Sequence, residues 1–225
     1  FDIEGVAEPV RLAFLLAHTE FEDKRVKFSE WGAMKSETPF GQLPILEIGD
    51  DSRKMTQSMA LLRYVGTMEA DGSLYPKEFM FEIEEAIALL ADLDKAWGPA
   101  LYFPRKPTAF GHDDPDFAKT DKGKEAVKTM RETFVSEELS KYCKFIENLL
   151  EKSGTGWIAP TKTPSIADCV AVPALRKFSR GFIDHVPSDC LAPYPKVVDY
   201  LERFCALPEV KGRYHDGIGG VPKEE

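Results

Sequence analysis

The sequence contains few cysteines, no long apolar run and no excess of basic residues. Its four cysteines form no Cys-x-x-Cys pair and no zinc-ligand spacing with histidine, so we expect reduced thiols, no metal site and no dithiol exchange. The longest purely apolar run, residues 12–17, is too short to span a membrane. A net charge of −9 argues against nucleic acid or an anionic membrane as a partner, because both bind through an excess of Lys and Arg. These absences, with no targeting leader in view, predict a cytoplasmic protein.

Hydrophobic periodicity divides the 225 residues into two parts. In residues 1–70, short β-rich runs at 1–3, 26–28, 45–48 and 53–56 alternate with helical patterns at 8–18 and 58–69, with a turn at 49–52. Residues 71–77 carry Gly and Pro and are typical of a linker, whereas residues 78–225 show long helical patterns and a Pro-rich loop at 103–122. The sequence therefore predicts a small α/β domain, a linker and an all-α domain.

Two polar segments of the first domain have the features of a peptide-binding site. Gln42 and Leu43 precede Pro44 and the strand pattern at 45–48, and proline cannot donate to a strand ladder. The Leu43 backbone can therefore stay free for an extended guest, which would pair like an added strand. Gln57 and Ser58 open a helical pattern, where unpaired N–H groups attract a carboxylate. Together the segments predict a site for a tripeptide.

The same stretch resembles the glutathione site of the cytosolic glutathione transferases, most closely the sigma-like class. The resemblance lies in Pro-Phe-Gly-Gln-Leu-Pro-Ile-Leu-Glu at 39–47 and Gln-Ser-Met-Ala-Leu-Leu-Arg-Tyr at 57–64, and it continues at 4–12, 165–168, 194–197 and 206–211. It implies a thioredoxin-like domain at 1–70, a linker at 71–77 and a helical domain at 78–225 that contributes the electrophile pocket. It also implies a detoxifying transferase that uses glutathione as a co-substrate and needs no bound cofactor.

The resemblance assigns glutathione to a definite set of residues. Trp31 and Lys35 would bind the glycyl carboxylate, through an indole N–H and a point charge. The peptide bond before Pro44 would be cis, directing the Leu43 backbone towards the cysteinyl residue. Ser58, with Gln57, would hold the γ-glutamyl carboxylate. The full expected set is Trp31, Lys35, Gly41, Gln42, Leu43, Pro44, Gln57, Ser58 and Asp92.

Relatives of this kind also suggest a symmetric homodimer. Asp92 would reach across the dimer axis to the γ-glutamyl ammonium in the other subunit, and Asp94 is the alternative. Phe40 would be an interface residue, since some transferase classes insert an aromatic side chain at this position into the partner.

Catalysis would be attack of the glutathione thiolate on an electrophilic centre. In sigma-like transferases, a tyrosine hydroxyl immediately before the residue matching Phe1 stabilises the thiolate, so we expect tyrosine there in the parent polypeptide. Val6 and Glu4 depart from the family pattern, because basic residues are common at both positions. The electrophile pocket would be lined by Gly5, Val6, residues 101–103 and the tail near Tyr214.

Other interpretations share these motifs. A glutathione-dependent isomerase of the prostaglandin D synthase type would use the same site and differ only in its second pocket, and a non-catalytic ligand-binding or structural relative is a further alternative. Ser165 and Asp168 fit a helix capping box, so Asp168 is expected to be structural. The four histidines lie in unlike contexts without a serine nucleophile elbow, which argues against a hydrolase.

Overall fold

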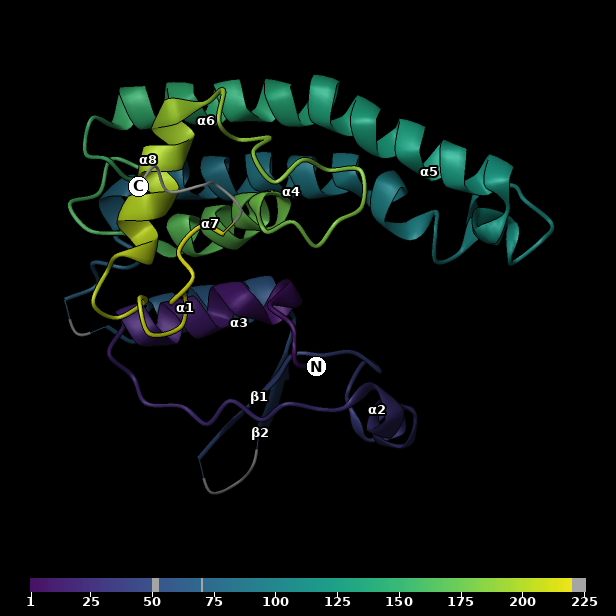
Figure 1. Ribbon diagram of the computed structural model, residues 1–225. Helices are drawn as coiled ribbons and strands as arrows, with labels where there is room; N and C mark the ends of the chain where they lie inside the picture. Colours follow the sequence, from purple (N-terminus) through teal and green to yellow (C-terminus); the bar gives the residue numbers. More distant parts are fainter. Residues whose placement is uncertain (50–52, 70, 220–225) are drawn as a thin grey trace.

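A computed structural model describes residues 1–49, 53–69 and 71–219. The first part of the chain forms α1 (Glu8–Leu16), α2 (Phe28–Met34), β1 (Ile45–Ile48), β2 (Arg53–Thr56) and α3 (Ser58–Gly66). In Figure 1, α1 and α3 lie side by side between the two strands and the helices of the second part. Most of their apolar residues are buried, because these two helices are covered on both sides.

The sheet is smaller than the sequence predicts. Strands β1 and β2 pair antiparallel, with Ile45 opposite Thr56, as expected for 45–48 and 53–56; the turn between them includes residues 50–52, which lie outside the described residues. The prediction of strands at 1–3 and 26–28 was wrong, because neither segment forms one. The Phe1 and Ile3 carbonyls accept hydrogen bonds from Arg25 Nη1, at 3.0 and 3.1 Å, and α2 begins at Phe28. Guanidinium donors, rather than a strand ladder, satisfy these backbone carbonyls.

The second part of the described chain is all helical, as predicted. It contains α4 (Met80–Tyr102), α5 (Asp121–Thr133), a π-helical segment (Phe134–Leu139), α6 (Ser140–Ser153), α7 (Ile166–Ser179) and α8 (Pro195–Cys205). Its core includes three mutually packed aromatic rings: Trp97 lies 4.8 Å from Phe134 and 5.2 Å from Phe178, centroid to centroid. No helix of the described residues is long and apolar enough to cross a membrane.

The two parts meet closely around α7. The Leu74 carbonyl in the predicted linker accepts a 2.9 Å hydrogen bond from the Ile166 N–H, at the start of α7. A Cβ added to Gly66, at the end of α3, would lie 2.6 Å from Ile166 Cγ2, so only glycine permits this approach. The domain boundaries at residues 70 and 78 remain a prediction, but the segment between them is hydrogen-bonded to α7 through Leu74 and to α4 through Tyr75.

The sequence correctly assigns Ser165 and Asp168 to a structural role. Both side chains of the capping box are fully buried, and Asp168 also accepts hydrogen bonds from the Ile158 N–H and the Tyr200 hydroxyl. The cysteines are free thiols, of which only Cys190 is partly exposed. Burial raises the pKa of the Cys143 thiol to about 12 and that of Cys190 to about 11. These thiols are therefore poor nucleophiles at neutral pH.

Candidate active site

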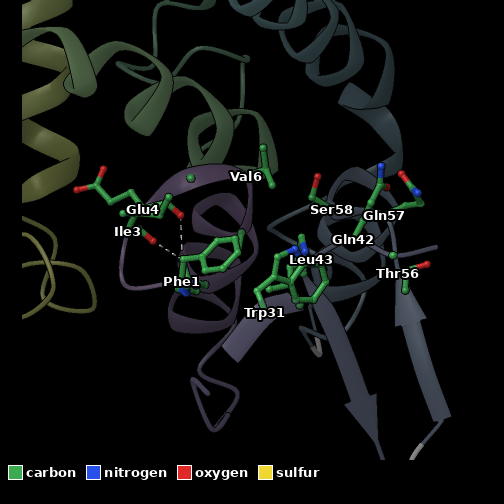
Figure 2. Close-up of a pocket in the computed structure, with 15 residues that line it drawn as sticks. Phe1, Ile3, Glu4, Val6, Trp31, Gln42, Leu43, Thr56, Gln57 and Ser58 are labelled. Carbon is green, nitrogen blue, oxygen red and sulfur yellow. Dashed lines mark hydrogen bonds between the residues drawn. The ribbon is translucent and has the colours of Figure 1, made fainter. Parts of the chain in front are cut away.

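A cavity of about 460 Å³ lies where the start of the chain meets the loops before β1 and α3 (Figure 2). Ser58 and Gln57 lie on one side of it, and Phe1 lies on the other. Its lining residues come from three stretches of chain, 3–7, 41–44 and 56–58, and from three single positions, Phe1, Arg11 and Trp31. The fold thus brings together segments that are more than fifty residues apart in the sequence.

Most of the sequence-predicted site residues line this cavity. Seven of the nine do so: Trp31, Gly41, Gln42, Leu43, Pro44, Gln57 and Ser58. Lys35 lies just outside, on a 3₁₀ turn, and a Cβ on Gly41 would meet its Cε at 3.2 Å. Asp92 lies on α4, exposed and away from the cavity lining. The structure therefore brings eight of these positions into one neighbourhood and places Asp92 elsewhere on the same chain.

The backbone edge at Leu43 has the geometry expected from the sequence. The Leu43–Pro44 peptide bond is cis, and β1 begins only at Ile45. Among the residues that the structure describes, no hydrogen bond uses the Leu43 N–H or C=O. This edge faces the cavity with one donor and one acceptor available for an extended peptide.

The start of α3 supplies the second polar feature. Ser58 is the first helical residue and Gln57 is the N-cap, with a φ of 73° that is unusual for a residue other than glycine. The Gln57 carbonyl accepts the Ala60 and Leu61 N–H groups, both at 2.9 Å, and so begins the helical hydrogen-bond pattern. The N–H groups of the first turn and the helix dipole favour an anion next to Ser58.

Trp31 lies on a helix. It belongs to α2, and its indole packs edge-on against Phe1, with centroids 6.0 Å apart. The Phe1 ring in turn stacks on Phe28 at 4.1 Å. This aromatic group holds the Trp31 ring at the cavity wall, where its N–H can donate to a ligand.

The sequence did not indicate that Arg11, paired with Glu8 and Asp23, lies at the cavity wall. Arg11 is the one cation among the lining residues, and it is fixed by 3.0 Å hydrogen bonds to Glu8 and Asp23. Glu8 is completely buried, which makes this arrangement rigid. An arginine directly before the apolar run at 12–17 was the signal that could have identified it. Glu4 is the one acid in the lining.

Two of the residues expected in the electrophile pocket line the cavity, and two others do not. Gly5 and Val6 line the cavity, and Val6 is 64% exposed. The prediction that Phe103 and Tyr214 line this pocket was wrong. Phe103 is buried against Phe110 at a centroid distance of 5.6 Å, and Tyr214 is buried beneath a guanidinium of α7. The loop at 103–122 thus has its own aromatic cluster.

Comparison with known proteins identifies the family. Residues 1–67 match the model of the glutathione S-transferase N-terminal domain, and residues 116–214 match that of the C-terminal domain. The chain belongs to the glutathione S-transferase family. It is 29% identical to glutathione S-transferase 1 of Ascaris suum over 224 residues, covering 94% of this chain and 91% of that protein. The predicted transferase activity, conjugation of glutathione to electrophiles, is thus confirmed.

Solved structures show the same fold. Prostaglandin synthase D of Nilaparvata lugens superposes with a TM-score of 0.72 at 22% identity, covering all of this chain and 96% of that one. A Nu-class glutathione transferase from Haemonchus contortus gives a TM-score of 0.68 at 23% identity, covering all of this chain and 95% of that one. The expected glutathione transferase fold, a thioredoxin-like domain followed by a helical domain, is therefore confirmed.

Proposed function

We propose that the cavity is the glutathione site of this transferase. The observation that carries the proposal is the meeting of two features in one cavity: the free backbone edge of Leu43 and the N-terminus of α3 at Ser58. The Leu43 edge would pair with the cysteinyl backbone, and Ser58 with Gln57 would bind the γ-glutamyl carboxylate. Trp31 and Lys35 would hold the glycyl carboxylate.

The reaction needs a thiolate at the cavity wall. A free thiol has a pKa of about 8.5, so the site must favour the ionised sulfur. The thiol loses its proton, the sulfur forms a bond to the electrophilic carbon, and the leaving group departs with its electron pair. Arg11 supplies positive charge to the cavity lining, whereas Val6 supplies none where a basic residue is common in sigma-like relatives.

The hydroxyl that stabilises the thiolate would come from tyrosine immediately before Phe1. Phe1 lines the cavity, so a residue joined to its nitrogen starts at the wall of the site. A tyrosine, with a pKa of about 10, stays protonated while it donates to the sulfur. Replacing that tyrosine by phenylalanine should lower turnover and raise the thiol pKa of bound glutathione, with affinity nearly unchanged. Lost affinity at an unaltered thiol pKa would show that the hydroxyl only positions the ligand.

The electrophile would be apolar, and the enzyme would belong to the sigma-like class. Ile3 and Val6 expose 54% and 64% of their surface next to the proposed sulfur position, which suits an apolar substrate. The sigma-like assignment depends on the motifs at 39–47 and 57–64. We also propose a cytoplasmic, detoxifying role, which a fluorescent fusion and a survey of electrophiles would test.

We propose a homodimer in which Asp92 faces the partner's glutathione. Asp94, the alternative acid, bonds Lys177 on α7 at 2.5 Å, whereas Asp92 is exposed and makes no ion pair within the described residues. Phe40 is 65% exposed and remains an interface candidate. Light scattering should give about twice the 25.3 kDa chain mass, and Asp92→Asn should weaken glutathione binding. A monomeric mass in dilute solution would refute both proposals.

Ser58→Ala tests the glutathione site. Calorimetry should show glutathione binding weakened by about 1–3 kcal/mol, the value of one hydrogen bond to a charged group. Thr120→Ala is the matched control, because the Thr120 hydroxyl also lies at a helix start, where it accepts the Gly123 N–H at 3.1 Å, far from the cavity. The control should keep full affinity. Equal affinity of Ser58→Ala and the parent protein would remove Ser58 from the site.

A further inference from the structure

Glu4 belongs to the cavity wall, but its carboxylate binds residues of the helical part of the protein. Residues 3–7 form one wall of the cavity, yet Figure 2 shows the Glu4 carboxylate pointing away from Ser58 and Gln57. The carboxylate accepts hydrogen bonds from Arg176, at 2.5 Å, and from Arg180. Both arginines belong to the C-terminal end of α7 and its cap, in the helical part of the protein. A single side chain therefore ties the cavity wall to the second part of the chain.

Arg176 is a rigid anchor for this contact. Its side chain is completely buried, its Nε donates to the Gly217 carbonyl at 2.7 Å, and its Nη2 donates to Asp216. Its guanidinium also lies over the Tyr214 ring, 4.0 Å from the centroid. Because these contacts hold the Arg176 guanidinium in place, it also fixes the position of the Glu4 carboxylate that it binds.

The wall itself has little other support. Regular strands in the described chain are confined to 45–48 and 53–56, so no strand ladder holds residues 3–7. Their fixed points are the arginine donors to the Ile3 and Glu4 carbonyls and the Glu4 carboxylate itself. Gly5, at a φ of 54°, turns the chain directly after Glu4 into the short 3₁₀ segment that carries Val6. A displaced Glu4 would therefore shift Val6.

We propose that Glu4 is a positioning residue for the electrophile: its bonds to Arg176 and Arg180 place the wall that carries Gly5 and Val6. The two guanidiniums face two carboxylates, those of Glu4 and Asp216, so the group is neutral and does not form an anion site. This positioning role rests on the proposed function, in which Gly5 and Val6 line the electrophile side of the cavity.

The first variant is Glu4→Gln, assayed with glutathione and a model aryl halide. We expect the KM for the halide to rise about 3- to 10-fold. This change corresponds to the free energy of one partly exposed charge-assisted hydrogen bond. The Kd for glutathione should stay within about twofold, because Leu43 and Ser58 lie on other segments. Arg180 does not line the cavity, yet Arg180→Met should raise the halide KM by a similar factor. Arg180→Lys should bring the halide KM most of the way back to the parent value. In the double variant Glu4→Gln with Arg180→Met, the two effects should not add.

Glu84→Gln is the matched control. Glu84 also joins the two parts of the chain and also accepts from two side chains, Arg63 at 2.8 Å and Tyr75 at 2.7 Å, with similar exposure. It should lower the melting temperature like Glu4→Gln but leave the halide KM unchanged. An unaltered halide KM in Glu4→Gln and Arg180→Met, or an equal rise in the control, would overturn the inference. Failure of the parent protein to bind glutathione would instead overturn the proposed site.

Discussion

Replacing Asp168 by alanine should lower the free energy of unfolding by about 3–5 kcal/mol, although this acid lies far from the cavity. Its carboxylate is fully buried and accepts the Ser165 N–H at 2.7 Å, the Ile158 N–H at 3.0 Å and the Tyr200 hydroxyl at 2.9 Å. Burial raises the pKa of Asp168, and the hydrogen bonds oppose that rise. The side chain therefore connects α7, α8 and the loop before α7.

The magnitude follows from the groups left behind. Alanine would strand four buried donors, the Ser165 hydroxyl included, each of which costs about 1–3 kcal/mol without a partner, and water entering the vacated space would satisfy some of them. Urea unfolding followed by circular dichroism gives the difference directly. Asp199→Ala, an exposed aspartate on α8, should change stability by less than about 0.5 kcal/mol. A loss below about 1 kcal/mol for Asp168→Ala would refute the structural role assigned to this residue.

Three further predictions follow from packing and ionisation. Gly66→Ala should lower the melting temperature through about 1–3 kcal/mol of overpacking, since the new Cβ would lie 2.6 Å from Ile166; an unchanged melting temperature would contradict this close approach. A thiol reagent at pH 7.5 should modify the native protein slowly and all four cysteines after denaturation, because burial raises the thiol pKa values; rapid native labelling would contradict their burial. The hydrogen bond from Arg63 lowers the pKa of Glu84, so its carboxylate contributes stability above about pH 4.3 that disappears as pH falls through the lower folded value. Glu84→Gln should therefore flatten the acid side of the stability profile, and a profile as steep as that of the parent would refute it.

The parts of the fold that the sequence predicts well are those with local signals. The helices at 8–16 and 58–66 and the strands at 45–48 and 53–56 carry apolar periodicity bounded by Gly, Pro or a cap, and all are present. The segments at 1–3 and 26–28 have β-rich composition, but the Phe1 and Ile3 carbonyls accept hydrogen bonds from Arg25, and the Lys27 carbonyl accepts the first N–H groups of α2. Arginine contacts over such distances are properties of the folded chain.

The site shows the same division. Gln42, Leu43 and Ser58 could be identified because a proline-ended edge and a helix start each have a sequence signature. Glu4 could not, since its role depends on Arg176, 172 residues later in the chain. Phe103 was misplaced for a related reason: its apolar side chain suits a pocket or a core equally well, and only packing against Phe110 decides between them.

In the proposed function, one cavity binds glutathione through the Leu43 edge and the start of α3. A crystal structure of the protein with glutathione tests it most directly. We expect the cysteinyl N–H and C=O to be hydrogen-bonded to the Leu43 backbone, with the γ-glutamyl carboxylate at Ser58 and the sulfur facing Phe1. Glutathione bound in another cavity, or bound here in an orientation that leaves the Leu43 backbone unpaired, would contradict it.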